Sequence, residues 1–490
     1  MSIIHFETIN ESFVRLNTDI GILREISGKF SFRVDGYQFM TRFKSGIWDG
    51  YIRPINTKNG YCPKGLVPKV MQYIRDNGYE YTIDRGFDRF KEVVKFDYKT
   101  LNLPHEPHDY QISALDLFLT KKRQVILSAT GSGKSMTIYM MTHAILDYIE
   151  EHQKILIVVP TVGLVSQMFN DFKDYSVNNG WDVDGNVHQI IGGKSKTTNK
   201  KILISTWQSL YAIKENSYFE QFDAIICDEV HCAAAASLSA IMERSTNAFY
   251  RVGVSGTLDG SQIAETALIG HFGPIRRVSS TSDLIDRKIL AELKIFLLTL
   301  TYSEEISKET KYFDYAAEMD WLVRNEYRNN FICRLAKTIN GNTLILIQFI
   351  EKQGKVLEQK LKEICPDKQV YFVYGGTDAE DRESVRKIAE SHSNVIILAS
   401  YPVFQAGVNI KNLPNLILGS PTKSVIRLLQ SIGRGLRKHD DKEYCRVYDI
   451  SDDLRGKRKK MNYTLKHCLE RIKIYQNEGF DVSEKIINVK

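Results

Sequence analysis

The sequence predicts an α/β protein in which two parallel-sheet lobes of similar size follow a smaller N-terminal α/β domain. The first observation is an alternation of short apolar strands with helical stretches from about 96 to 280, with strands VILSA, KILIVVP, KILIST and FDAIICD. The second is the recurrence of this pattern from about 285 to 475, with NTLILIQF, VYFVY, NVIILAS, NLILGS and CRVYDI. Such alternation is typical of parallel strands joined by crossover helices.

The length of 490 residues indicates several domains, because a single hydrophobic core stops growing at roughly 250 to 300 residues. We expect an accessory domain over residues 1–95, a first lobe over 96–282 and a second lobe over 283–490. The polar run SSTSD at 279–283 is the best candidate for the hinge between the lobes.

Composition excludes some classes of protein. Hydrophobic residues make up 43% and charged residues 26%, and no segment approaches the roughly 18 apolar residues of a membrane span. The start, MSIIHFETINES, lacks the basic and then apolar order of a secretory signal, so we expect a cytoplasmic protein. The seven cysteines form no C-x-x-C pair, which argues against a disulfide framework or a zinc site. A net charge of +7 fits a polyanionic partner but also fits many metabolic enzymes.

Aromatic and basic residues are interleaved in the accessory domain. SFRVDGYQFM at 31–40 alternates apolar and polar residues around Asp35 and Gly36, which predicts a tight β-hairpin. The aromatic rings offer stacking faces and the basic side chains offer phosphate contacts, so we expect this domain to bind nucleic acid. The alternative is that about half of the aromatic residues form the core of the domain. The residues concerned are Phe30, Phe32, Arg33, Tyr37, Phe39, Arg42, Phe43, Lys44, Trp48, Tyr51 and Arg53.

SATGSGKS at 128–135 has the context of a phosphate-binding loop, since it follows an apolar strand and precedes a helical stretch. In that context, backbone N–H groups and the helix N-terminus converge on an anion. Gly131 and Gly133 permit the tight turn, Lys134 is expected to reach the β- and γ-phosphates, and Ser135 offers its hydroxyl to Mg²⁺. The sequence therefore predicts a site for ATP and Mg²⁺.

CDEVH at 227–231 ends the apolar strand FDAIIC, so its acidic side chains are expected at the carboxyl end of a sheet strand. Asp228 is expected to hold Mg²⁺. Glu229 is expected to orient and deprotonate the attacking water, while the metal and Lys134 offset the charge that develops on the phosphates.

DEVH, together with QSIGRGLR at 430–437, resembles the superfamily 2 helicases, the motor family with two RecA-like lobes and a DEAH-type box. The resemblance covers roughly residues 105–440 and implies that the second lobe faces the first across a cleft. Arg434 and Arg437 would then reach the γ-phosphate bound by Lys134. Guanidinium suits this task because it is permanently charged and binds phosphate oxygens in a bidentate manner.

Other segments match the motifs of this family in order. SGT at 255–257 stands where the family has SAT, the segment that links hydrolysis to lobe movement, and Asn409 stands where it has aspartate, which weakens the implied ribose contact. The implied catalytic residues are Lys134, Asp228, Glu229, His231, Arg434 and Arg437. The implied nucleotide contacts are Tyr110, Gln111, Thr130, Gly131, Ser132, Gly133, Lys134, Ser135, Gly407, Asn409 and Gln430, with Ser135 and Asp228 at the metal. The implied nucleic-acid contacts are Thr161, Ser205, Thr206, Gln348, Gly375 and Ser400.

Over its whole length the chain resembles phage helicases that process branched DNA. That resemblance implies ATP-dependent unwinding and branch migration of forks, Holliday junctions and R-loops in recombination, repair and replication. We expect a monomer in the host cytoplasm whose partner is DNA, either branched or with junctions of single and double strands, and for which RNA in R-loops is a further partner. The residues by themselves indicate only an ATPase motor that nucleic acid stimulates.

Four other functions share parts of this pattern. An RNA helicase carries the same motifs, and the motor subunit of a restriction system carries a similar motor. A protein-translocating ATPase would need large inserted domains, for which 490 residues leave little room. A DNA-binding scaffold with a decayed ATP site would have lost at least one of Lys134, Asp228, Glu229 and Arg434, and all four are present.

A basic run, Arg455–Lys460, opens the stretch 454–476, whose apolar residues recur at helical spacing. We expect a helix across the second lobe. Its basic start either meets nucleic acid or forms a solvated face.

Overall fold

The computed structural model describes residues 3–34, 36–87, 94–193, 195–232, 235–258, 262–405, 412–421 and 444–489. The chain divides into two compact units, residues 1–128 with 133–279, and residues 280–490 with 129–132. The unit boundary falls after Ser279, within the SSTSD run. The domain limits at 95/96 and 282/283 stay predictions.

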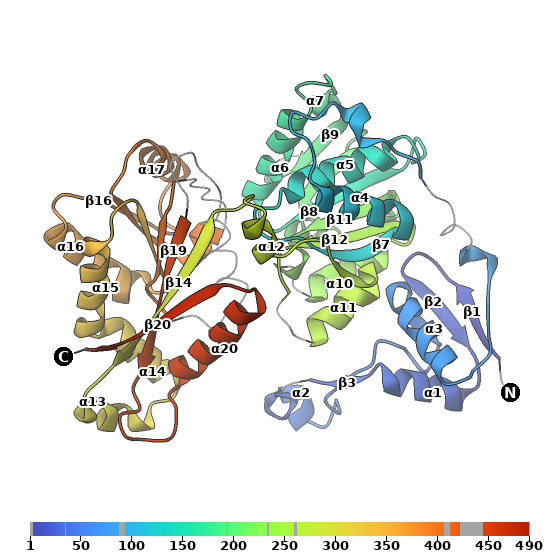
Figure 1. The fold of residues 1–490 in the computed structure, drawn as a ribbon. Helices are drawn as coiled ribbons and strands as arrows, with labels where there is room; N and C mark the ends of the chain where they lie inside the picture. The colour runs from blue at the N-terminus through green and yellow to red at the C-terminus, as the bar shows by residue number, and fades with distance from the viewer. Residues whose placement is uncertain are drawn as a thin grey trace. The chain divides into compact units, whose positions relative to one another are not determined.

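The N-terminal part of the first unit is a small mixed sheet covered by two helices (Figure 1). Its strand order is β5-β2-β1-β6, where β1 pairs with β2 in antiparallel and with β6 in parallel orientation. Alternate residues of β1 and β2 face inward, so that Ile4, Phe6, Val14 and Leu16 are buried. The elements are β1 Ile4–Thr8, β2 Phe13–Asn17, α1 Ile20–Lys29, β5 Tyr61–Pro63, α3 Val67–Asp76 and β6 Tyr81–Ile83.

A two-stranded ribbon extends from this sheet, and the tight hairpin predicted around Asp35 and Gly36 is wrong. Strand β3 (Phe32–Arg33) pairs with β4 (Tyr51–Ile52), and the short helices η1 (Tyr37–Phe39) and α2 (Thr41–Lys44) lie between them. Contacts between rings explain the longer connection. The Tyr37 ring lies 4.6 Å from that of Phe43 and 4.0 Å from the Arg33 guanidinium, so these side chains pack locally instead of alternating along a hairpin.

Seven parallel strands form the large sheet of the first unit, in the order β13-β7-β12-β11-β8-β10-β9. Every residue of β7, β10, β11 and β12 is buried, because helices cover both faces of the sheet. The strands are β7 Arg123–Leu127, β8 Lys154–Val159, β9 Val187–Ile190, β10 Ile202–Thr206, β11 Phe222–Asp228, β12 Tyr250–Ser255 and β13 Ile275–Arg277.

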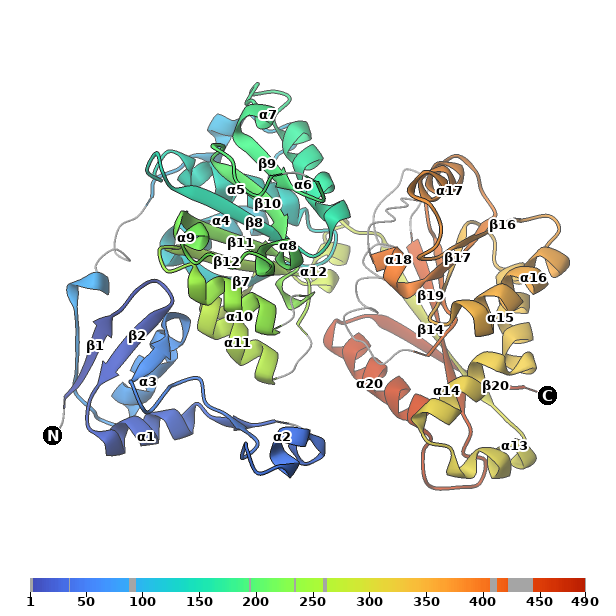
Figure 2. The same cartoon turned by 180° about the vertical axis from the view of Figure 1, so that it is seen from behind.

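Helices pack on the two faces of this sheet (Figures 1 and 2). Side chains of α4, α5 and α6 enter one hydrophobic core, and side chains of α8, α10 and α11 enter the other. The main helices are α4 Asp109–Lys121, α5 Lys134–Leu146, α6 Val162–Tyr175, α8 Trp207–Tyr211, α10 Ala235–Arg244 and α11 Gln262–Phe272. Shorter helices are η4 Tyr98–Leu101, α7 Val183–Asn186, α9 Ser217–Glu220 and η5 Val230–Cys232.

A buried charge cluster joins the small sheet to the large one. The Glu11 carboxylate accepts hydrogen bonds from Lys64 Nζ at 3.0 Å and from Arg123 Nη2 at 2.8 Å. Burial raises the pKa of Glu11, but the charges of Arg123 and Lys64 outweigh burial and hold that pKa below its ordinary value. The neighbouring Ser12 hydroxyl accepts from Arg251 Nη2 at 2.9 Å, and Arg251 is fully buried.

Close backbone packing reinforces this junction. Gly65 of η2 (Lys64–Leu66) lies so near α11 that a Cβ atom there would stand 2.1 Å from the carbonyl oxygen of Ile269. The side chain of Ile269 in turn enters the core of the small sheet. The two sheets therefore share buried surface rather than only a chain connection.

The second unit also carries a seven-stranded parallel sheet, in the order β16-β17-β15-β18-β19-β14-β20. The predicted pair of parallel-sheet lobes is therefore confirmed. Strand β20 was not predicted, because it lies at the sheet edge with most residues exposed and so lacks an apolar run. The strands are β14 Glu292–Thr301, β15 Thr343–Ile347, β16 Gln369–Val373, β17 Val395–Ser400, β18 Asn415–Leu418, β19 Tyr444–Asp453 and β20 Asp481–Asn488.

The helix expected from residue 454 onward begins later. Helix α20 spans Tyr463–Asn477 and packs on β19 and α14, so Arg455–Lys460 form a loop before it. No described helix has the length and apolar character needed to cross a membrane. The other helices of this unit are α12 Thr281–Asp286, α13 Glu304–Glu309, η6 Thr310–Tyr312, α14 Tyr315–Arg324, α15 Glu326–Thr338, the π-helix η7 Ile350–Gly354, α16 Lys355–Ile364, α17 Ala379–Ser391 and α18 Tyr401–Gln405.

His143 predicts a pH dependence of the stability of the first unit. Burial lowers the pKa of this α5 imidazole from 6.5 to about 4. Below pH 6.5 the unfolded chain binds a proton that the folded imidazole refuses, so the free energy of unfolding falls as pH drops from 6.5 towards 4. Between pH 7 and pH 5, we expect the free energy of unfolding of His143→Phe to fall by about 2 kcal/mol less than that of the wild type.

Urea unfolding at the two pH values measures this difference through the fluorescence of Trp181, whose ring centroid lies 4.4 Å from that of His143. The control is His152→Phe, since the His152 side chain is 75% exposed. An unchanged pH dependence in His143→Phe would contradict the assignment.

Candidate ATP site and nucleic-acid contacts

Three predicted motifs converge at one edge of the first large sheet. Strands β7, β12 and β11 are neighbours, and their register pairs Leu127 with Ser255 and Val254 with Asp228. The phosphate loop, SGT and DEVH follow these three strand ends directly. The carboxyl edge of a parallel sheet is where ligands of such folds bind, so the topology places the predicted motifs at the expected edge.

The phosphate loop requires its glycines. Gly131 and Gly133 have φ angles of +86° and +75°, which L side chains rarely adopt. A Cβ atom on Gly133 would also stand 2.6 Å from Nε2 of Gln111. Ser132 is buried, and its N–H donates to the carbonyl oxygen of Ala129 at 3.2 Å, whereas Thr130 is half-buried.

Gln111 is connected to the phosphate loop. Its Nε2 donates to the carbonyl oxygen of Gly133 at 3.1 Å, and its Oε1 accepts from the N–H of His108 at 2.8 Å. Tyr110 is buried, with its ring stacked on that of His108 at 5.3 Å. The predicted adenine contacts therefore lie directly beside the start of α5, which carries Lys134.

Lys134 and Glu229 form an ion pair, with Nζ and Oε1 3.0 Å apart. Burial raises the pKa of Glu229, but the Lys134 charge and the His231 imidazole lower it by more, so this carboxylate is ionised. Burial and the negative charge of Glu229 raise the pKa of Asp228 to about 7. The backbone of Glu229 has φ +46°, a conformation that costs energy for a residue with a side chain.

His231 connects this carboxylate to the SGT segment. Its Nδ1 lies 3.4 Å from Oε2 of Glu229 and 2.5 Å from Oγ of Ser255. The Ser255 hydroxyl donates to the carbonyl oxygen of Thr257 at 2.7 Å, so in this arrangement the proton between imidazole and hydroxyl belongs to Nδ1. A histidine at position 231 can therefore contact both Glu229 and Ser255.

The residues at this edge suit Mg²⁺. The carboxylate of Asp228 and the hydroxyl of Ser135 are hard oxygen ligands. Burial and the charge of Glu229 raise the pKa of Asp228, and a cation at the site would favour the ionised form of this carboxyl. The Ser135 hydroxyl lies 2.8 Å from that of Tyr175 and can donate to it while an oxygen lone pair remains for the metal. Among the described residues, no three His, Cys, Asp or Glu side chains form a metal cluster.

Five predicted site residues lie outside the described residues. They are Gly407, Asn409, Gln430, Arg434 and Arg437. Their roles at the nucleotide stay predictions.

The predicted nucleic-acid contacts differ in exposure. Gln348 and Gly375 are exposed, and Thr161 is half-buried at the N-terminus of α6, where its hydroxyl accepts from the N–H of Leu164. Ser205, Thr206 and Ser400 are buried. Ser205 donates to the carbonyl oxygen of Thr206, and Thr206 caps α8. The hydroxyls of Ser205 and Ser400 are therefore not available for a direct contact in this structure.

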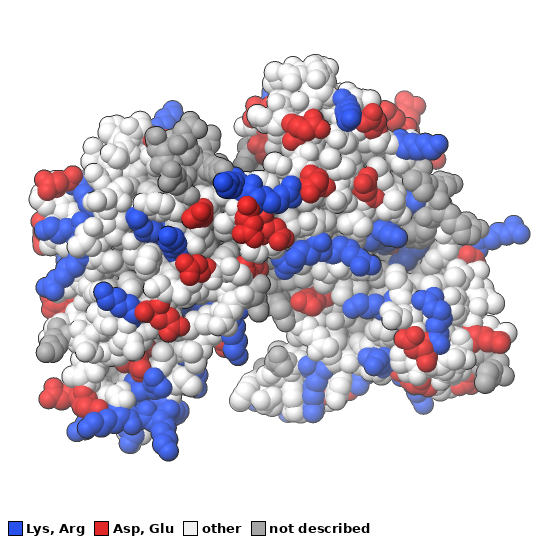
Figure 3. Space-filling model, in the orientation of Figure 1, with Lys and Arg blue, Asp and Glu red and all other residues white. Residues whose placement is uncertain are grey.

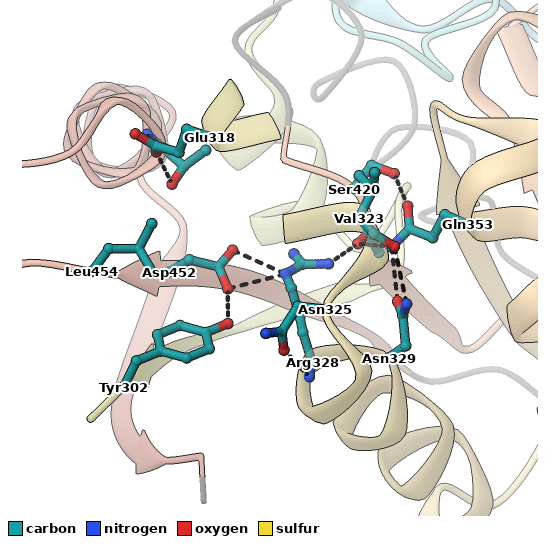
Figure 4. Close-up of polar contacts among 12 residues, drawn as sticks. Tyr302, Glu318, Val323, Asn325, Arg328, Asn329, Gln353, Ser420, Asp452 and Leu454 are labelled. Atoms are coloured by element: carbon teal, nitrogen blue, oxygen red, sulfur yellow. Dashed lines mark hydrogen bonds and ion pairs between the residues drawn. The ribbon is translucent and has the colours of Figure 1, made fainter. Parts of the chain in front are cut away.

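The backbone of Gln348 is bonded to a buried polar network whose members motif matching missed; Figure 4 shows Arg328, Gln353, Ser420 and Asp452 of this network. The N–H of Gln348 donates to Oγ of Ser420 at 2.9 Å, and the Ser420 hydroxyl bonds to Gln353, which lies in the π-helix η7. Arg328 donates to the Gly419 carbonyl oxygen at 2.6 Å and pairs with Asp452 at 3.0 Å; both side chains are fully buried. No spacing in the sequence connects these residues, since they come from α15, η7, β19 and the segment that follows β18.

The ion pair predicts the effect of replacing Lys134. We expect Lys134→Ala to lower ATP turnover at least ~10²-fold, because the charge on the transferred phosphate loses its nearest cation, while nucleic-acid binding persists. Steady-state ATPase assays and fluorescence anisotropy test the two parts.

The matched control is Lys173→Ala, which removes a surface lysine of α6 that pairs with Asp184. Normal turnover in Lys134→Ala, or equal losses in the two variants, would contradict the phosphate-loop assignment.

Three family models match the chain. They are the N-terminal domain of the DNA helicase UvsW at residues 3–84, the res subunit of type III restriction enzymes at 104–260, and the helicase conserved C-terminal domain at 327–439. The ATP-dependent DNA helicase UvsW of Enterobacteria phage T4 is 32% identical over 99% of both chains. The crystal structure of T4 UvsW matches all of both chains, with a TM-score of 0.51 and 30% identity.

Similarity in fold alone extends further. The structure of S. cerevisiae Dbp5 bound to RNA and ADP BeF3 has a TM-score of 0.51 at 14% identity, and the match covers 79% of this chain and 90% of that one. The full-length identity to UvsW is what distinguishes this chain within the shared fold. With its two RecA-like lobes and its small N-terminal α/β domain, the chain belongs to the UvsW-like helicases of superfamily 2.

Proposed function

We propose that this protein is an ATP-dependent DNA helicase that unwinds and branch-migrates forks, Holliday junctions and R-loops in recombination, repair and replication. The observation that carries the proposal is the connected series Lys134, Glu229, His231 and Ser255, which joins the phosphate loop to SGT. The full-length similarity to a phage DNA helicase supports DNA as the substrate. A monomer in the host cytoplasm is part of the same proposal.

The Lys134–Glu229 pair suggests how ATP starts the cycle. An arriving triphosphate competes for Lys134, because its charge exceeds that of one carboxylate. Glu229 is then free to orient a water molecule and accept its proton. Mg²⁺ held by Asp228 and Ser135 would supply charge neutralisation at the phosphates. His231, which contacts both Glu229 and Ser255, passes the displacement of Glu229 to the SGT segment.

Arg434 and Arg437 would complete this site from the second lobe. A closed state that places these guanidinium groups on the γ-phosphate is favoured by ATP, and hydrolysis removes the contact that favours closure. Each lobe would hold the strand through sequence-independent phosphate contacts, of which Thr161, Gln348 and Gly375 are the accessible candidates. Alternation of the two states would then move the strand.

The ribbon of the N-terminal domain is the proposed contact for the DNA branch. Between β3 and β4, the side chains of Phe39 and Ile47 are 75% and 80% exposed. The Arg33 guanidinium lies 4.0 Å from the Tyr37 ring centroid and 5.4 Å from that of Tyr51, so its charge is held against two rings. Exposed apolar side chains beside fixed cations suit unpaired bases and their phosphates.

Deletion of the N-terminal domain is a poor test of this role. Arg123 and Arg251 belong to β7 and β12, and removal of residues 1–95 would take away Glu11, the carboxylate that pairs with the buried Arg123, and Ser12, which accepts from Arg251. A buried charge stripped of its partner costs roughly 3 to 5 kcal/mol. Substitutions in the ribbon avoid this damage.

ATPase activity tests the function first. We expect forked DNA to stimulate steady-state turnover at least ~10-fold over the nucleic-acid-free rate and to exceed RNA of the same length. Stimulation should weaken between 50 and 200 mM salt, because the phosphate contacts release counterions. Stimulation by RNA alone would favour an RNA helicase, and the absence of stimulation by either would contradict the proposed motor.

The ribbon yields a separate prediction. We expect the double variant Phe39→Ala, Ile47→Ala to bind a fork at least ~5-fold more weakly, because stacked bases lose about 1 kcal/mol or more each, and to keep its nucleic-acid-free ATPase rate. Anisotropy with a labelled fork measures the effect.

The matched control is Ile20→Ala, Ile83→Ala, which removes two apolar side chains, 49% and 42% exposed, from other parts of the N-terminal domain. If the Phe39→Ala, Ile47→Ala variant binds the fork as tightly as the control variant does, the ribbon does not contact the DNA branch.

A further inference from the structure

The basic loop Arg455–Lys460 separates its positive charges into two groups. Arg455 pairs with Asp453 at 2.7 Å, and Arg458 donates to Oγ of Ser307 at 3.1 Å, so both guanidinium groups serve the local structure. Lys457, Lys459 and Lys460 are exposed and have no ion-pair partner among the described residues. The three lysines are thus presented to solvent.

The loop is held in place at both ends. Asn462 accepts from the N–H of Leu454 at 3.1 Å and donates to the carbonyl oxygen of Asp452 at 3.0 Å, which closes the base of the loop. Gly456 has φ +57°, and a Cβ atom there would stand 2.7 Å from Oγ of Ser307. Only a glycine permits this approach to α13. Because the loop is fixed, little conformational entropy would be lost when a ligand binds the lysines.

Helix α13 and η6 extend the patch. Lys308 and Lys311 are exposed, and Figure 3 shows basic side chains gathered at the end of the second unit where this loop and α13 lie. Glu304, Glu305 and Glu309 of α13 weaken the positive field but are fewer than the basic residues around them. The surface remains suited to a polyanion.

An exposed aromatic ring indicates which polyanion. Tyr312 is 84% exposed, and Nζ of Lys311 lies 4.9 Å from its ring centroid. Tyr312 stands five residues after Ser307, which contacts the loop. With two residues in α13 and three in the 3₁₀ turn η6, the backbone rises roughly 9 Å between them. A lysine group with an accessible ring beside it is the combination that binds single strands, because phosphates pair with the lysines and a base stacks on the ring.

We propose that this surface, made by Lys457, Lys459, Lys460, Lys308, Lys311 and Tyr312, is a second binding site for single-stranded DNA on the second lobe. Its residues are distinct from the motif residues Gln348 and Gly375, which follow β15 and β16 at the same carboxyl edge of the sheet, and β18 lies between β15 and β19. It holds a strand without taking part in hydrolysis. The inference rests on the proposed DNA-handling function.

The test is the triple variant Lys457→Gln, Lys459→Gln, Lys460→Gln. Anisotropy at several salt concentrations should show at least ~10-fold weaker binding of a single-stranded oligonucleotide, with the slope of log affinity against log salt reduced by about 2. The affinity for blunt duplex should change less than ~2-fold. Tyr312→Ala should lower single-strand affinity at least ~5-fold.

The matched control is Lys355→Gln, Lys360→Gln, Lys362→Gln, which removes three lysines of α16 that are paired with glutamates. An equal loss of single-strand affinity in the control variant would overturn the proposal. An equal loss of duplex affinity in the Lys457→Gln, Lys459→Gln, Lys460→Gln variant would overturn it as well. At saturating single-stranded DNA, the triple variant should keep ATP turnover within ~2-fold while the DNA concentration for half-maximal stimulation rises. If DNA does not stimulate ATP turnover in the wild type, the proposed function is refuted. The binding comparison would still show whether the loop binds single-stranded DNA.

Discussion

The buried carboxylate of Glu11 is the contact on which the arrangement of the first unit depends. It binds Arg123 at the start of β7, and its neighbour Ser12 binds Arg251 near the start of β12. The carboxyl ends of these same two strands carry the phosphate loop and SGT, roughly 15 Å away at 3.3 Å per residue. The N-terminal domain is therefore fixed to the opposite ends of the strands that present the ATP site. A force on DNA bound by the ribbon would therefore reach the large sheet through these buried contacts and not only through the chain connection.

At the other end of these strands, the ATP site also depends on one buried carboxylate. Glu229 is held by Lys134 on one side and His231 on the other, with a backbone conformation that is unfavourable for its side chain. Strain of this kind persists only where surrounding contacts enforce it. The ion pair provides that enforcement, and the triphosphate that removes Lys134 would also relax it. In the proposed cycle, substrate binding, release of the base and movement of SGT would therefore be coupled.

Local motifs were predictable because their chemistry fixes the spacing. Gly131, Gly133 and Lys134, and likewise Asp228 and Glu229, must be adjacent in sequence to act together, and strand–loop patterns place them at a sheet edge. The burial of single residues was not predictable from these motifs. Ser205 and Ser400 match helicase motifs, yet both residues are buried in the protein. Glu11 and Arg328 escaped prediction because their side-chain partners stand more than 50 residues away in sequence and no periodicity joins them.

The distribution of cations shows why net charge was a weak guide to partners. Four arginines, at positions 123, 251, 328 and 471, are buried in hydrogen-bonded sites, so their charge does not reach the surface. Guanidinium suits such sites because its fixed fork makes several hydrogen bonds at once, whereas an ammonium group retains water strongly. The loop at 455–460 repeats this division within six residues, with two arginines facing the protein and three lysines facing solvent. Among the described residues, burial therefore decides which cations a polyanion can reach, and the positions of basic residues rather than their number mark where a strand would bind.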